Sequence, residues 1–396
     1  MQNNRISDFW AVLYCSLLVL YSYLEITALD TATFASPLLA TSKIAIIIIA
    51  IYVVAFRGQF SYSSALTRFW SLWITWLIVE FTILFNSGAG YGCLHSFFAP
   101  SCFFLVYYLC LLDPLSEKKL VQGFIILYLL TGAYSVYLSF YIGTVYWETG
   151  KLVSNLVFWP LCAFVFVPIV KKQLLQYFLL VPMIIISLLL AKRSAMIIIV
   201  LEVLVYSFYQ LKYAQKRVRG NKRSNIVLYL IVGAIAVGII SSKFSTFTES
   251  TFSRFETMQD DQGSGRVEVY QSAISKIENF SSLDILFGRG FGSIVEIGNS
   301  AAHNDALQFF YEFGFVGFSL YLAFIIILLR RIRIIRNYAM DYYVGYLFCV
   351  ITAIILGLFS NLVAFNSYFA FICSYLGVAE AAVYRRIHQI NDGKNA

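Results

Sequence analysis

The chain has 396 residues, of which 60% are hydrophobic and 13% are charged, and its formal net charge is +8. Apolar runs of about 20 residues recur along it, and this is the length that a helix needs to cross a bilayer. The composition excludes a soluble globular domain, and the surplus of Lys and Arg is interpreted as a topology signal, so no nucleic-acid partner is expected.

The apolar runs predict an all-α polytopic membrane protein with about twelve transmembrane helices. The first run begins near Phe9, is too long for a signal-peptide core and lacks a small-residue cleavage site, so it is interpreted as a retained helix. The expected spans are 9–29, 36–56, 66–86, 91–112, 118–142, 151–170, 172–191, 194–211, 225–242, 314–330, 343–361 and 367–384.

The cations in the connections predict the orientation. With the N-terminus inside, 20 of the 29 Lys and Arg residues fall in cytoplasmic connections and tails, as the positive-inside rule requires. Residues 1–242 then form an N-terminal bundle of nine helices, and 243–313 form a large extracytoplasmic loop with amphipathic helices. Residues 314–396 supply three C-terminal helices and a cytoplasmic tail, so both termini are expected in the cytoplasm.

Neither a disulfide framework nor a metal site is expected. The seven cysteines fall in or beside apolar runs and are interpreted as packing residues, and the three histidines form no cluster with metal-ligand spacing. Asp260 and Asp261 in the large loop are adjacent carboxylates that could hold a divalent cation, but a solvated pair is the preferred interpretation. No cofactor is predicted.

Three carboxylates lie inside apolar runs. Glu25, Glu80 and Glu202 are each costly in a bilayer unless they are paired or wetted. Structural pairing and a polar cavity both remain open as explanations.

Two cations sit together in a short connection between the seventh and eighth predicted spans. Lys192 and Arg193 lie where the outer membrane interface is expected, with little room to reach away from it. An anionic partner is therefore predicted, and contact with ordinary lipid headgroups is the alternative.

The large loop contains further arginines and a predicted amphipathic helix. Val267, Tyr270, Ile274 and Ile277 follow a helical spacing, and Ser264 is a plausible N-cap for them. Arg266 would lie in the first turn, where the helix dipole disfavours a cation unless an anion shares the site. Arg254 and Arg289 are weaker candidates for the same role, and a solvated surface arginine is the alternative for all three.

Glycines recur before the end of the loop. The stretch Gly288-Arg289-Gly290-Phe291-Gly292 lacks the third glycine of a dinucleotide-binding fingerprint, and no βαβ unit surrounds it. A nucleotide site is therefore rejected, and these glycines are predicted to form a turn that returns the loop to His303.

The loop ends on the stretch that joins it to an apolar helix. Asn304 is a plausible N-cap, so a short helix is expected to run to about Phe313 before Gly314 and Gly317 break it. His303 would lie at the positive end of that helix, where it stays neutral and can accept a proton from a hydroxyl. A pair that only caps a helix at the membrane surface is the alternative.

The spacing of this stretch resembles a known signature. His303 and Asn304, then nine residues, Gly314, two residues and Gly317 match the pattern of the O-antigen ligase and polymerase family. The resemblance extends to the Ser-Gly-Arg start of the loop helix at Arg266, the glycine-rich stretch before the histidine, and an arginine beside small residues at Arg193. It covers about residues 190–330, and the first 180 residues match only as a helical plan.

The resemblance implies a metal-independent inverting glycosyltransferase of the bacterial inner membrane that uses undecaprenyl-diphosphate-linked oligosaccharide. His303 would be the catalytic base, and Arg193 and Arg266 would stabilise the leaving diphosphate. Lys192, Asn304, Arg254 and Arg289 would contribute to substrate binding, and Gly314 and Gly317 would be structural. Membrane lipids are expected partners, as are a chain-length regulator and a flippase of the same pathway.

Four functions remain open. A surface-polysaccharide polymerase is favoured because the large loop and the aromatic, isoleucine-rich N-terminal half are more typical of polymerases than of ligases. An O-antigen ligase, which transfers the glycan to lipid A–core, is the alternative. A secondary transporter is disfavoured because the halves show no internal repeat, and a non-catalytic scaffold would make His303 dispensable.

Overall fold

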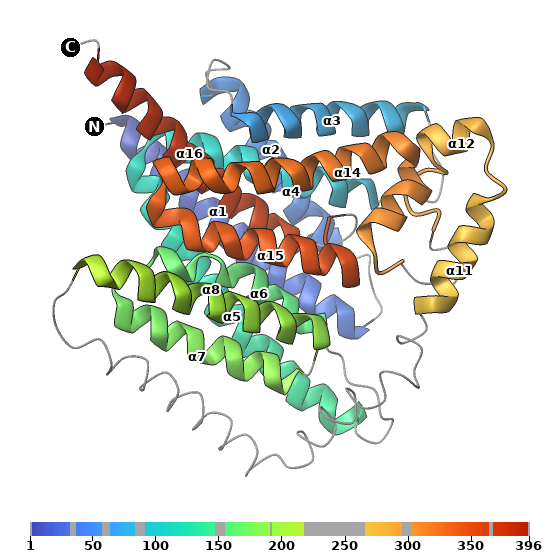
Figure 1. Cartoon of the computed structure of the whole chain (residues 1–396), viewed down its shortest axis with the longest axis horizontal. Coiled ribbons are helices and arrows are strands. Elements are labelled where there is room, and N and C mark those ends of the chain that lie inside the picture. The colour runs from blue at the N-terminus through green and yellow to red at the C-terminus, as the bar shows by residue number, and fades with distance from the viewer. Residues whose placement is uncertain are drawn as a thin grey trace.

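The computed structural model describes most of the chain and shows one helical bundle (Figure 1). The described residues are 2–31, 37–57, 64–83, 92–146, 155–190, 192–217, 266–294, 302–363 and 367–394. Within these ranges every regular element is a helix, so the predicted all-α class is confirmed.

Long apolar helices dominate the first half of the chain. Their lengths follow from unbroken runs of Ile, Leu, Val and aromatic residues, which propagate a helix that buries its own backbone hydrogen bonds. They are α1 (Gln2–Thr31), α2 (Pro37–Arg57), α3 (Ala65–Ile83), α4 (Gly92–Leu112) and α5 (Pro114–Tyr146).

The second half mixes long helices with short ones. After η1 (Asn155–Val157) come α6 (Phe158–Phe164), η2 (Val167–Ile169), α7 (Gln173–Leu189) and α8 (Arg193–Arg217). The described part of the large loop holds α11 (Arg266–Ile277) and α12 (Ser282–Phe287). The chain closes with α14 (Asp305–Tyr338), η3 (Met340–Tyr342), α15 (Tyr343–Phe359) and α16 (Phe369–Lys394).

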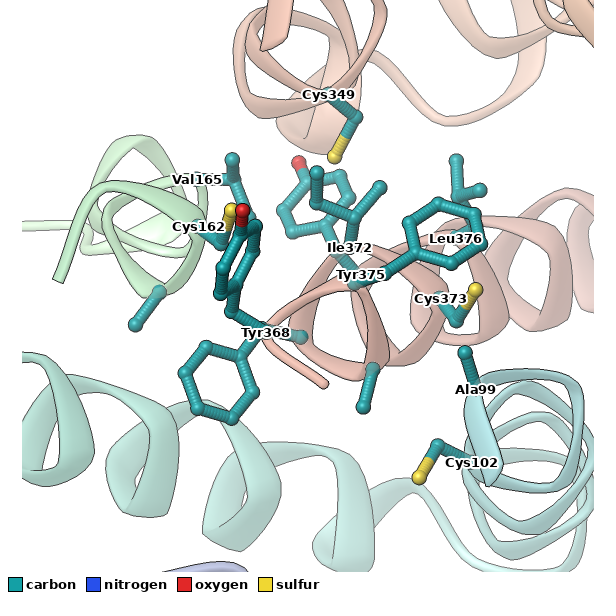
Figure 2. Packing of buried hydrophobic residues seen from close by; sticks show 14 of the residues in the cluster. Ala99, Cys102, Cys162, Val165, Cys349, Tyr368, Ile372, Cys373, Tyr375 and Leu376 are labelled. Atoms are coloured by element: carbon teal, nitrogen blue, oxygen red, sulfur yellow. The ribbon is translucent and has the colours of Figure 1, made fainter. Parts of the chain in front are cut away.

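The last helix forms the centre of the bundle. Figure 2 shows α16 enclosed by α4, α6 and α15, with Tyr368, Ile372 and Cys373 among the side chains that fill the space between them. The six cysteines whose surroundings the structure describes are free, and five are buried, so their predicted packing role is confirmed there.

Six helical segments are long and apolar enough to cross a membrane: Asp8–Thr27, Pro37–Phe56, Pro114–Leu138, Arg193–Gln210, Asp305–Tyr338 and Met340–Phe359. Shorter apolar helices are Ser96–Leu112, Asn155–Ile169 and Gln173–Ser187. The chain is therefore a multi-pass membrane protein by length and composition, whereas the count of about twelve spans stays a prediction. The span expected at 225–242 lies outside the described residues.

One expected span differs from the structure. The span expected at 151–170 is described from residue 155, and there it is divided into η1, α6 and η2. Pro160 lies in the first turn of α6, where a proline is tolerated, whereas Pro168 has no N–H to donate to the carbonyl of Phe164, at which α6 ends. The short helix expected to run to about Phe313 is confirmed, because Gly314 leaves the helical conformation and separates it from a second helix that continues to Tyr338 within α14.

The chain termini and the described loop helices lie at opposite ends of the bundle (Figure 1). The start of α1 and the end of α16 lie at one end of the bundle, and α11 and α12 lie at the other. This arrangement separates the described loop helices from both ends of the chain, and the sides of the membrane on which they lie stay a prediction.

The three carboxylates inside apolar runs have different surroundings. Glu25 accepts a hydrogen bond from Ser367 Oγ at 2.7 Å, and the fully buried Lys43 lies within electrostatic reach of it. Glu202 accepts from Thr352 Oγ1 at 3.1 Å. Glu80 is 2% exposed, and its carboxylate oxygens have no hydrogen-bond partner within the described part of the chain. Structural pairing therefore explains Glu25, whereas the second carboxylate oxygen of Glu202 has no hydrogen-bond partner among the described residues, so pairing leaves Glu202 and Glu80 unexplained.

Candidate functional site

His303 directly precedes the helix that carries the signature. Asn304 is the N-cap of α14 and its side chain accepts a hydrogen bond from the Leu307 N–H at 3.0 Å, so the predicted cap is confirmed. His303 has a φ of 54°, a left-handed conformation that costs a residue with a Cβ about 1–2 kcal/mol. Strain of this kind is retained when the surrounding structure fixes it, and it often marks functional positions.

Asp305 anchors the start of α14 to the turn after α15. Its Oδ2 accepts hydrogen bonds from the backbone N–H groups of Leu362 and Val363, both at 3.0 Å, and the residue is fully buried. We call residues 360–363 the 360–363 turn. The Asn304 side-chain amide also donates to Leu358 O at 3.4 Å. These three contacts fix the backbone around His303 against the end of α15.

A buried chain of amides and carboxylate continues along the same face of α14. Asn361 in the 360–363 turn donates to Gln308 Oε1 at 2.7 Å, and Gln308 Nε2 donates to Glu312 Oε1 at 3.1 Å. Backbone N–H groups of Gly292 and Ile294 also interact with the Glu312 carboxylate. The residues at 305, 308 and 312 thus connect the 360–363 turn with the glycine-rich turn of the loop.

The glycines at 288 and 314 allow two backbones to touch. A Cβ on Gly314 would lie 2.4 Å from the Leu286 carbonyl carbon, and a Cβ on Gly288 would lie 2.2 Å from Glu312 O. Both residues have a positive φ, 62° and 79°. The N–H groups of Arg289 and Gly290 donate to the carbonyls of Tyr311 and Glu312 at 3.1 and 2.9 Å. The glycine-rich turn at 288–292 therefore packs against residues 311–314 of α14.

Gly317 has a different role from the one predicted. The helix is not broken there, because the only non-helical residue within α14 is Gly314. A Cβ on Gly317 would lie 2.1 Å from the Phe313 Cβ, so its missing side chain makes room for Phe313 where the helix bends. Both signature glycines therefore contribute to the same bend of α14 at Gly314.

The Lys192–Arg193 connection reaches the same turn from another helix. Ser194 Oγ, next to Arg193 at the start of α8, lies 3.4 Å from Ser360 Oγ in the 360–363 turn. Lys192 Nζ lies 5.7 Å from the centroid of the Phe158 ring. The 360–363 turn therefore contacts both the helix that Arg193 begins and the helix that follows His303, which the sequence separates by more than a hundred residues.

Arg289 is held within the loop. Its guanidinium lies 3.3 Å from Asp284 Oδ2 and 5.0 Å from the centroid of the Phe280 ring, while 47% of the side chain is exposed. A surface ion pair of this kind is worth at most about 1 kcal/mol, so an anionic ligand could compete with Asp284 for Arg289.

The side chains of two candidate arginines, Arg266 and Arg254, lie outside the described part of the chain. Arg266 begins α11, as predicted for the loop helix, but its side chain is outside the described part. Arg254, Ser264, Asp260 and Asp261 all lie outside the described residues. Their roles stay predictions.

Sequence reasoning missed the polar residues that hold the site together. Asp305, Gln308 and Glu312 are spaced by three and four residues, so they share one helix face, and all three are fully buried. That spacing was a readable signal of a buried polar face. Their partners at Asn361 and Ser360 had no comparable signal, because only the fold brings the 360–363 turn to α14.

The described arrangement can support chemistry on an anionic, hydroxyl-bearing substrate. A half-buried histidine precedes the helix whose Asp305 binds the 360–363 turn, and Ser194, the residue after Arg193, lies 3.4 Å from Ser360 of the same turn. A neutral imidazole accepts a proton, and nearby cations stabilise negative charge that develops on a leaving group.

A comparison with known protein families identifies the region that carries this site. Residues 178–322 match the family described as O-antigen ligase. The matched region begins in α7 and includes α8, α11, α12, His303 and both signature glycines. No curated protein matches the chain. The predicted resemblance to O-antigen polymerases and ligases is therefore confirmed.

Proposed function

We propose that this chain, whose residues 178–322 match the O-antigen ligase family, is a surface-polysaccharide polymerase. It would transfer an undecaprenyl-diphosphate-linked glycan onto the next lipid-linked repeat unit at the outer face of the bacterial inner membrane. The observation that carries the proposal is the shared 360–363 turn, which contacts the helix after His303 and the helix begun by Arg193.

The proposed reaction assigns one role to each group. His303 takes the proton from the acceptor hydroxyl as its oxygen attacks the anomeric carbon. The bond from that carbon to the diphosphate breaks, and the diphosphate leaves with the electron pair. Arg193 and Arg266 stabilise the charge that develops on it, with Lys192, Asn304, Arg254 and Arg289 contributing to binding. No step needs a metal ion.

Direct displacement predicts an inverted anomeric configuration. Proton NMR of the product and of the lipid-linked donor would compare the two configurations at the new linkage. A product that keeps the donor's configuration would overturn the single-displacement mechanism.

The second candidate is an O-antigen ligase that transfers the finished chain to lipid A–core. The description of the matched family favours it. The large loop and the aromatic N-terminal half favour the polymerase. The chemistry at His303 is the same in both, since only the acceptor differs. A chain-length regulator and a flippase of the same pathway are proposed partners of either enzyme.

Complementation separates these proposals. A host that lacks its own polymerase, and that carries the matching repeat-unit genes, would express the wild type, His303→Ala or Arg266→Ala, and its glycans would be separated on a gel. A ladder with the wild type, but only single repeats on core with both variants, would support a polymerase that uses these residues.

The other outcomes are equally informative, provided that each variant is found in the membrane in normal amount. In a second host that lacks its own ligase instead, lipid-linked polymer that reaches the bare core only when the wild-type chain is expressed would indicate the ligase. A ladder that is unchanged in His303→Ala would refute the catalytic assignment and leave a scaffold role. Substrate counterflow in proteoliposomes would indicate a transporter instead.

A further inference from the structure

The helix α12 exposes apolar side chains at the end of the bundle where the loop helices lie. Four of its six residues are large and apolar, and none of the six is buried. Leu283 is 68% exposed, and Leu286 and Phe287 are 45% and 37% exposed. Positions 283, 286 and 287 are spaced by three and four residues, so these side chains share one face of the helix.

A capping box and contacts with α14 stabilise α12 at this position. Ser281 and Asp284 form a capping box, with both hydrogen bonds at 3.1 Å. The end of α12 is fixed to α14 by two backbone contacts, Gly288 against Glu312 and Gly314 against Leu286. A segment of six residues would not form a stable helix by itself in water. The capping box and the contacts with α14 therefore keep α12 helical, and its apolar side chains stay together on one exposed face.

The apolar face of α12 continues the lipid-facing surface of its neighbours. Gly314 abuts the Leu286 backbone, and the next residue, Phe315, is 56% exposed. From Phe315 the exposed face of α14 runs through Leu322, Ile326 and Leu329 at helical spacing. On the other side Phe287 stacks on Trp76 of α3, with ring centroids 6.0 Å apart.

The one charged residue of the helix, Asp284, lies at the edge of this face, and Ile285 on the opposite side is 44% exposed. Asp284 pairs with Arg289, whose guanidinium also lies over Phe280. An apolar face beside a charged one is the pattern of a helix that lies in the membrane interface. In Figure 1, α12 stands at the end of α3 and α14, where such an interface would cross the bundle.

We propose that α12 is an interfacial membrane helix whose Leu283, Leu286 and Phe287 side chains enter the bilayer leaflet at the end of the bundle where α11 and α12 lie. The partner is phospholipid, at the boundary between headgroups and acyl chains. Through Gly288 and the glycine-rich turn, this attachment holds the loop against α14 at the level of the membrane surface. The inference does not depend on the transferase proposal.

Site-directed spin labelling of the full chain in nanodiscs tests this contact without any enzymatic readout. A nitroxide on Leu283→Cys is compared with two references, Leu322→Cys on the exposed face of α14 and Glu278→Cys at the exposed end of α11. Collision rates with oxygen, which concentrates in the acyl region, and with a water-soluble nickel complex are measured. The unmodified chain gives the labelling background from the native cysteines.

The expected oxygen-to-nickel accessibility ratio at 283 is several-fold above that at 278 and approaches that at 322. A ratio equal to that at 278 would overturn the proposal, because it places α12 in water. Low accessibility to both reagents would also overturn it, since a second copy or another protein would then cover the face. Leu286→Cys repeats the measurement if the 283 variant does not assemble, and the same outcomes apply.

Discussion

The close approach of α12 and α14 predicts a large cost for a single added methyl group. Gly314 has φ 62° and ψ −159°, a region that only glycine occupies readily and that costs other residues about 1–3 kcal/mol. In Gly314→Ala the new Cβ would also lie 2.4–2.5 Å from backbone atoms of Leu286 and Phe287. Backbone cannot rotate away as a side chain can, so we add about 1–3 kcal/mol for overpacking. The expected loss of stability is about 2–6 kcal/mol.

Thermal unfolding in detergent measures this loss. A maleimide dye that fluoresces on reacting with thiols reports unfolding, because the described cysteines are free and become exposed as the bundle opens. Gly292→Ala is the matched control. Gly292 also has a positive φ, 78°, but a Cβ there would meet no atom of the described residues within 4 Å, so it carries only the conformational cost of about 1–2 kcal/mol.

Gly288→Ala completes the design. Its Cβ would meet Glu312 O at 2.2 Å, so it disrupts the same contact from the other side and should lower the midpoint about as much as Gly314→Ala. The double variant should cost less than the sum of the two, because one separation of α12 from α14 relieves both clashes. Equal midpoints for Gly314→Ala and Gly292→Ala would refute the reasoning, since the backbone contact would then contribute nothing.

Three further predictions concern buried polar groups. Asp305→Ala removes the acceptor of one buried and one partly buried backbone N–H group, and it should cost about 1–3 kcal/mol for the buried Leu362 donor and less for the Val363 donor. The same unfolding assay measures the loss, and Asp305→Asn should be milder. Gln308→Leu breaks the contacts to Glu312 and to the 360–363 turn, so the glycan ladder per amount of protein in the membrane should shorten even though His303 is intact. The Arg331 guanidinium donates to Glu380 Oε1 at 2.7 Å. Glu380→Ala removes this acceptor, leaves the arginine charge buried without a carboxylate, and should lower the free energy of unfolding by about 3–5 kcal/mol. Adding Arg331→Met should recover most of that loss in thermal unfolding, and additive losses would contradict the prediction.

The local features of the chain were predictable because local physics determines them. Runs of apolar residues require helices in a bilayer, where each backbone group must bond within its own segment. Asn304 caps α14 because a side-chain oxygen there satisfies a backbone donor of the first turn. The spacing from His303 to Gly317 could be matched to a family because it lies within one continuous stretch.

Where the local signal was ambiguous, the sequence prediction was only partly right. An apolar run at 151–170 is long enough for a span, yet the structure divides it, and α6 ends at Phe164, whose carbonyl receives no hydrogen bond from Pro168. Gly314 and Gly317 were both interpreted as helix breaks, because glycine lowers helix propensity wherever it occurs. Only Gly314 leaves the helical conformation, since the neighbouring α12 backbone occupies the space that its side chain would need.

By itself the sequence determined the helical class, the membrane character and the family signature, since each depends on residues close together in the chain. Only the tertiary structure decided which distant segments meet. Asn361 reaches Gln308, Ser360 reaches Ser194, and Gly288 meets Glu312, although no periodicity relates these positions. The reason is physical: helix formation depends on neighbours within a few residues, whereas the packing of helices depends on the shapes that all of them present at once.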